Sequence, residues 1–218
     1  EKELKNFFKL LYANSNCKHE ILVNKSNILK DLSLTEHLSL IETNIHDLDT
    51  NNLKEQFKNN IPFNHIILDN TINPDFLNKM ENEIRNLNFL EITSENVYGI
   101  DNVQKNKFSC RDFTKFKYAN QAKNYFESDE FLKWLSIITG IDNLQKDEYN
   151  HGNGIHIIKE NGKLDIYADF NRHSENKKYR RLNLLLYLNS NYEDKYNGKL
   201  ELWNKEMTEC VVKVPPTF

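Results

Sequence analysis

The hydrophobic period of this chain changes at Gly140, and this change constrains the fold more than any other feature. Before Gly140, the clearest apolar stripes recur every three or four positions, as in amphipathic helices. After it, apolar and polar residues alternate, as in strands that bury one face. Helices followed by strands are typical of α+β folds. We therefore expect an α+β protein whose second half is mainly β-sheet.

Two helices are predicted with defined ends. "NPDFLNKMENEIRNL" has Asn73 as its N-cap, Pro74 at the first helical position and one apolar stripe. "DEFLKWLSIIT" follows Ser128 as N-cap and ends before Gly140, a residue that suits a helix C-terminus. Apolar spacing also predicts a short helix at residues 3–12.

Strands are predicted mainly in the second half. "GIHIIKENGKLDIYAD" predicts a hairpin, since Asn161-Gly162 is a pair typical of tight turns between antiparallel strands. "RLNLLLYLN", "GKLELWN" and "ECVVKV" predict three further strands. "FNHIILD" predicts an earlier one, at residues 63–69, and residues 91–117 are predicted as loop and strand.

Composition narrows the range of functions. A net charge of −3 gives no argument for nucleic acid or an anionic membrane as partner. No apolar run approaches the roughly 20 residues that a transmembrane helix needs, and the first residues lack the pattern of a signal peptide. The three cysteines are far apart and lack C-x-x-C spacing, as expected for reduced thiols. We expect a cytoplasmic protein without a zinc site.

A polar patch precedes an apolar strand at residues 165–189. As a strand, "DIYADF" places Asp165, Tyr167 and Asp169 on one face. A charged loop ending in two arginines follows, and then "LNLLLYLN", which is apolar on both faces and predicted to be buried. The carboxylate of Asp169 and the phenol of Tyr167 lie beside a strand that is predicted to be buried. We therefore take this stretch as a candidate functional site.

Three motifs together resemble a known family. "GNGIHIIKENGKLDIYADFNRH", "RRLNLLLYLN" and "NGKLELW", in this order, are similar to the core of the iron(II)- and 2-oxoglutarate-dependent dioxygenases, in particular their prolyl-hydroxylase-like branch. The resemblance covers residues 62–218 and implies a double-stranded β-helix (jelly roll), with N-terminal helices packed on the sheet and the last strands beyond Phe218. Residues 1–61 are then an N-terminal extension or linker, mostly helical or irregular.

The resemblance implies Fe(II) and 2-oxoglutarate as cofactors. In the family, a His-x-Asp pair and a distant His hold the iron and leave positions open for the 2-oxo acid and dioxygen. Here Tyr167 takes the place of the His before Asp169, so that the implied metal ligands are Asp169 and Tyr167. Alternatively, Asp169 caps the following loop or pairs with Arg180 or Arg181, and Tyr167 fills the place of the lost imidazole.

The cosubstrate has two candidate partners. Related hydroxylases bind the 2-oxoglutarate carboxylate through a Tyr at the position that matches Tyr187, and His156 is a second candidate if it faces the barrel interior. Each has a structural alternative, as a core side chain bonded to the backbone. His173 and Glu175 formally make a His-x-Glu pair, but within a charged loop. The distant His and the usual basic partner of 2-oxoglutarate are expected downstream of the chain, and no catalytic acid or base is assigned.

The resemblance implies hydroxylation of a C–H bond, coupled to decarboxylation of 2-oxoglutarate to succinate. The implied substrate is a peptidyl (prolyl-like) group or a small molecule, with neither nucleic acid nor membrane as partner. The alternative is a degenerate, non-catalytic jelly roll that serves as a binding or scaffold module, which the Tyr at position 167 favours.

Overall fold

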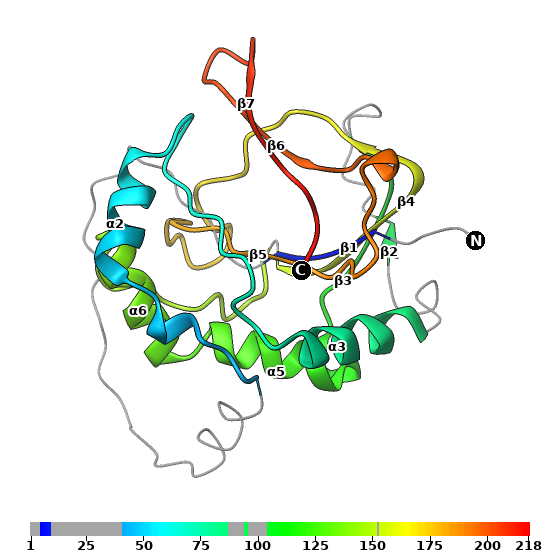
Figure 1. Cartoon of the computed structure of the whole chain (residues 1–218), viewed down its shortest axis with the longest axis horizontal. Helices are drawn as coiled ribbons and strands as arrows, with labels where there is room; N and C mark the ends of the chain where they lie inside the picture. The colour runs from blue at the N-terminus through cyan, green and yellow to red at the C-terminus, as the bar shows by residue number, and fades with distance from the viewer. Residues whose placement is uncertain (1–4, 10–40, 87–93, 96–103, 152) are drawn as a thin grey trace.

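The computed structural model describes most of the chain, in five ranges: residues 5–9, 41–86, 94–95, 104–151 and 153–218. They form one five-stranded antiparallel sheet, helices whose apolar side chains share a core with it, and a separate pair of strands near the C-terminus (Figure 1). The predicted mixture of helices and strands is therefore confirmed. The described strands make small antiparallel sheets, so the closed double-stranded β-helix stays a prediction.

The described helices are of ordinary length. They are α2 (Thr50–Asn59), α3 (Pro74–Asn86), α5 (Lys117–Phe126) and α6 (Asp129–Thr139), with short 3-10 turns η1 (Ile45–Asp47), η2 (Phe113–Lys115) and η3 (Asp194–Tyr196). Within the described ranges, no helix has both the length and the apolar character that crossing a bilayer requires.

The two helices predicted with defined ends are confirmed as α3 and α6. Asn73 Oδ1 accepts the backbone N–H of Asp75 at 2.7 Å. Ser128 Oγ accepts the N–H of Phe131 at 3.2 Å. Gly140 follows α6 with φ 66°, a left-handed conformation that glycine adopts at little cost. Local capping chemistry thus sets both helices.

The main sheet has the strand order β2-β3-β4-β1-β5. Its strands are β1 (Lys5–Lys9), β2 (Ser94–Glu95), β3 (Gln104–Cys110), β4 (Gly154–Leu164) and β5 (Leu185–Tyr187). The separate pair is β6 (Leu200–Trp203) and β7 (Cys210–Val214), which confirms the last two predicted strands. In Figure 1 this pair lies on the opposite side of the main sheet from α3 and α5.

The helix predicted for residues 3–12 is wrong where the structure describes it. Residues 5–9 form β1, which pairs antiparallel with β4 on one side and β5 on the other. Ladders on both sides outweigh a local helical period, because intrinsic propensity is a weak prior. The strand predicted at 63–69 is also wrong, since no strand is assigned there and the nearest pairing is an isolated bridge between Thr43 and Ile72.

The predicted hairpin around Asn161-Gly162 is wrong as well. Both residues lie inside the single long strand β4. Asn161 does adopt a left-handed conformation, φ 59°, but it produces an irregularity in the ladder with β3, whose register shifts between Lys105 and Lys107. A Cβ on Gly162 would lie 2.6 Å from the backbone carbonyl oxygen of Lys159 and would also meet Ile158 Cγ2, so only glycine fits. Asn161 and Gly162 therefore belong to an irregular part of the ladder between β3 and β4, and not to a turn between two strands.

The strand expected to carry Asp169 is also absent. Residues 165–170 have no assigned strand, and the apolar strand after the loop is reduced to β5. The polar loop before β5 pairs with itself instead, through a bridge between Arg172 and Tyr179. The candidate site is therefore built on a loop beside the sheet.

One face of the main sheet belongs to the hydrophobic core. Ile155 and Ile157 of β4, 0% and 1% exposed, join this core together with apolar residues of α3, α5 and α6. Ile41 and Phe57 belong to the same core. The predicted boundary between residues 1–61 and 62–218 stays a prediction.

Helix α5, which local sequence did not predict, begins with a cap from another helix. Its N-cap residue, Phe116, has no polar side chain. The carboxylate of Glu83, on α3, takes this role. It accepts the N–H groups of Lys117 and Tyr118 at 2.8 and 3.0 Å and that of Ala119 at 2.6 Å. A negative charge at this end also complements the helix dipole.

Replacing Glu83 with alanine should therefore lower the free energy of unfolding by about 1–2 kcal/mol, because three backbone donors lose their acceptor. Urea denaturation followed by circular dichroism measures the change. Glu206→Ala, at an exposed position, is the matched control. Equal stability of the two variants would refute a capping role for Glu83.

Candidate functional site

The sheet face opposite the core carries His156 and Tyr187. His156 follows Ile155 on β4, and successive side chains of a strand point to opposite faces, so His156 points away from the core that takes Ile155. In the register, Phe7 of β1 lies opposite both His156 and Tyr187. Residues opposite one another in antiparallel strands share a face. The two predicted cosubstrate residues therefore lie on one face, with one strand between them.

Ser109 extends this row on the other side. It lies opposite His156 in the ladder between β3 and β4, and both side chains are buried, 5% and 6% exposed. The adjacent Cys110 belongs to the core, so Ser109 points to the same face as His156. The face away from the helices thus presents a hydroxyl, an imidazole and a phenol in one cross-strand row.

Burial raises the pKa of Tyr187, and the nearby Tyr167 raises it further. The phenol of Tyr187 is therefore protonated at neutral pH and can donate a hydrogen bond. Tyr167 itself is 45% exposed and lies in the loop after β4. The two tyrosines are close enough to interact electrostatically, although local sequence placed them on separate strands.

Asp169 has a cationic neighbour. Its side chain is 10% exposed, and its Oδ1 lies 3.9 Å from Nη1 of Arg180, which is also 10% exposed. The guanidinium lies over the ring of Phe170, with Cζ 4.5 Å from the ring centroid. The pairing that the sequence offered as the alternative to metal ligation is therefore present.

The loop between Asp169 and β5 folds back on itself, which brings the two charges together. Arg180 N–H donates to the carbonyl of Asn171 at 2.9 Å, and His173 N–H donates to the carbonyl of Lys178 at 2.8 Å. We call residues 171–180 the returning loop. Because the two ends of the loop meet, Asp169, just before the loop, lies beside Arg180 at its end.

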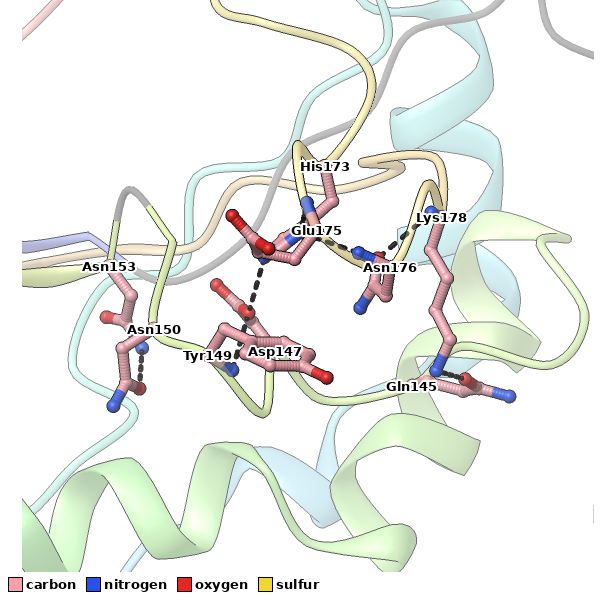
Figure 2. Close-up of polar contacts among 9 residues, drawn as sticks. All are labelled: Gln145, Asp147, Tyr149, Asn150, Asn153, His173, Glu175, Asn176 and Lys178. Atoms are coloured by element: carbon pink, nitrogen blue, oxygen red, sulfur yellow. Dashed lines mark hydrogen bonds and ion pairs between the residues drawn. The ribbon is translucent and has the colours of Figure 1, made fainter.

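The returning loop is fastened to the segment after α6, as Figure 2 shows. His173 Nδ1 accepts the N–H groups of Glu175 and Asn176 at 3.0 and 3.3 Å, which assigns the ring proton of neutral His173 to Nε2. That Nε2 lies 3.6 Å from Asp147 Oδ1. The formal His-x-Glu pair is therefore used within the loop, with the imidazole turned towards Asp147.

A second contact lies along the same junction. Lys178 Nζ donates to Gln145 Oε1 at 2.5 Å (Figure 2). Together with the contact between His173 and Asp147, it fixes the returning loop at two points. These contacts join segments about thirty residues apart, and no local sequence pattern would reveal them.

His151 lies between this junction and the neighbourhood of Asp169. Its ring centroid is 4.6 Å from that of His173 and 4.8 Å from that of Phe170. Burial lowers the pKa of His151, and the neighbouring His173, Arg111 and Arg180 lower it further, against the opposing effect of Asp147. His151 therefore resists protonation in the folded protein.

The described residues do not complete an iron site. Among them, no group of three or more His, Cys, Asp or Glu side chains is arranged to hold a metal ion. Asp169 provides one suitable carboxylate, which lies beside Arg180. Tyr167 has a phenol, which must lose its proton before it can bind a metal ion. The assignment of Asp169 and Tyr167 as metal ligands stays a prediction.

The comparisons with known proteins agree with the resemblance at a coarse level. The sequence profile described as 2OG-Fe(II) oxygenase superfamily matches residues 153–218, a stretch that includes β4 to β7 and the returning loop. No match was found among curated proteins or among solved structures. The match supports an oxygenase of this superfamily, with its Fe(II) and 2-oxoglutarate, for this part of the chain. It does not single out the prolyl-hydroxylase-like branch.

The lowered pKa of His151 predicts a loss of stability in mild acid. The unfolded chain takes up a proton near pH 6.5, whereas the folded protein does so only at lower pH. The free energy of unfolding should therefore fall as pH falls below about 6.5. Urea denaturation between pH 5.5 and 8 measures this dependence. His151→Gln should make it shallower, and an unchanged dependence would contradict the assignment.

Proposed function

We propose that this chain carries part of an Fe(II)- and 2-oxoglutarate-dependent oxygenase that hydroxylates a C–H bond. The observation that carries the proposal is the superfamily match over residues 153–218, because this stretch contains His156, Tyr187 and Asp169. His156 and Tyr187 share the sheet face that is not covered by the helical core. This placement suits a cosubstrate bound against the sheet.

Tyr187 is proposed to bind a carboxylate of 2-oxoglutarate. Its raised pKa keeps the phenol protonated, so that it donates rather than repels. A hydrogen bond from a buried donor to a charged acceptor is also among the stronger ones in proteins. His156, in the same cross-strand row, is proposed to contact the same cosubstrate from the other side of β1.

Asp169 is proposed as a metal ligand, with Tyr167 in the position that a His takes in the resembling family. The remaining ligands would come from outside the described residues. When bound, Fe(II) and 2-oxoglutarate supply the oxidising chemistry, in which one oxygen atom of O₂ enters the substrate and the other enters succinate. The residues of this chain would bind and orient the metal ion and the cosubstrate and would shield them from water.

The finer assignments rest on the sequence resemblance. We propose a peptidyl, prolyl-like group or a small molecule as substrate, neither nucleic acid nor a membrane as partner, and a cytoplasmic location. The net charge of −3 gives no reason to expect a polyanionic partner.

Anaerobic titration with Fe(II) and 2-oxoglutarate tests the proposal. A chelate of the two gives a metal-to-ligand charge-transfer absorption band in the visible region, which we expect for the full-length enzyme and not for its Asp169→Asn variant. Absence of the band from the unaltered full-length protein would favour the non-catalytic scaffold. In that case, a band that appears in Tyr167→His would identify the lost imidazole as the cause.

Tyr187→Phe should weaken 2-oxoglutarate binding about tenfold or more, because one hydrogen bond to a charged group is worth roughly 1.5–3 kcal/mol. Affinity for Fe(II) alone should not change. Isothermal titration under anaerobic conditions measures both affinities. Tyr149→Phe, at a position 57% exposed, is the matched control. Equal 2-oxoglutarate affinities in the two variants would remove Tyr187 from the site.

A further inference from the structure

Asp169 and Arg180 form a buried pair whose geometry leaves room for competition. Each side chain is 10% exposed, and Oδ1 and Nη1 are 3.9 Å apart. A direct hydrogen bond between such atoms would measure about 2.7–3.2 Å. The guanidinium thus acts on this carboxylate oxygen through its charge and does not bond to it directly.

The position of Arg180 is fixed by more than this attraction. Its backbone N–H is bonded to Asn171, and its guanidinium rests 4.5 Å from the ring centroid of Phe170. The returning loop is in turn fastened through His173 and Lys178 to the segment after α6. Arg180 is therefore held beside Asp169 by the loop as a whole.

A cation held at this distance opposes a second cation at the same carboxylate. Water screens the two charges little, because both side chains are nearly buried, and the repulsion between a guanidinium and a divalent ion a few ångströms away is substantial. A metal ion at Asp169 must either overcome this repulsion or displace Arg180 from its place over Phe170.

We propose that Arg180 is a positioning residue that neutralises Asp169 and thereby sets the affinity of this carboxylate for a divalent cation. The inference rests on the proposed function, in that it treats Asp169 as the metal-binding carboxylate.

The test is a titration of the whole chain with Mn(II), which needs neither dioxygen nor 2-oxoglutarate. Free Mn(II) is measured by electron paramagnetic resonance. Arg180→Gln should bind Mn(II) about tenfold more tightly than the unaltered chain, because the opposing charge is gone. Arg181→Gln removes the same charge from the next residue and should change the affinity by less than about twofold.

Two further variants complete the test. Asp169→Asn combined with Arg180→Gln should abolish the increase in Mn(II) affinity. That loss would show that the additional Mn(II) affinity comes from the carboxylate of Asp169. Phe170→Leu keeps every charge but removes the ring beneath the guanidinium, and should raise Mn(II) affinity by roughly twofold to fivefold. Phe170→Leu decides the question if circular dichroism shows that Arg180→Gln does not fold.

The proposal is overturned if the folded variants of Arg180 and Phe170 bind Mn(II) no more tightly than Arg181→Gln, or if none of them binds it. The proposed function fails separately. If the unaltered protein gives the charge-transfer band but Arg180→Gln does not bind Mn(II) more tightly, only the role of Arg180 is refuted. If Arg180→Gln binds Mn(II) more tightly but no charge-transfer band appears, only the proposed oxygenase function is refuted.

Discussion

The candidate site depends on the backbone ladder of β1. Lys5–Lys9 pair with β4 on one side and β5 on the other, and without this strand His156 and Tyr187 would not be held in one row. Each bond of a ladder contributes little by itself, but the register it imposes decides which side chains share a face. A segment far from the superfamily match in sequence thus orders two residues that lie inside that match.

A second constraint is the burial of charge. Asp169 and Arg180 are nearly buried, and a buried charge is tolerated only beside a partner. The returning loop provides this partner through its backbone bonds and through its contacts with the segment after α6. Burial lowers the pKa of His151 nearby, and the positive charges of Arg111 and Arg180 add to this effect. The electrostatics of the site therefore follow from how one loop is folded and fastened.

Sequence reasoning succeeded where the determining chemistry is local. The caps at Asn73 and Ser128 act within three residues, and both helices are where they were expected. Sequence reasoning failed where pairing with a segment far away in the sequence determines the local structure. The helical spacing of residues 3–12 gave way at 5–9 to strand pairing, and the left-handed Asn161 became part of a bulge once β3 lay beside it.

By itself, the sequence determined the mixture of helices and strands, the start of α3, both ends of α6, and the motifs that match the oxygenase superfamily. These features depend on periodicity, capping and residue type, all of which act over a few positions. Only the tertiary structure decided that His156 and Tyr187 share a face, that Asp169 lies beside Arg180 and that His173 faces Asp147. Such contacts join segments brought together by sheet register and loop closure, which no short stretch of sequence specifies.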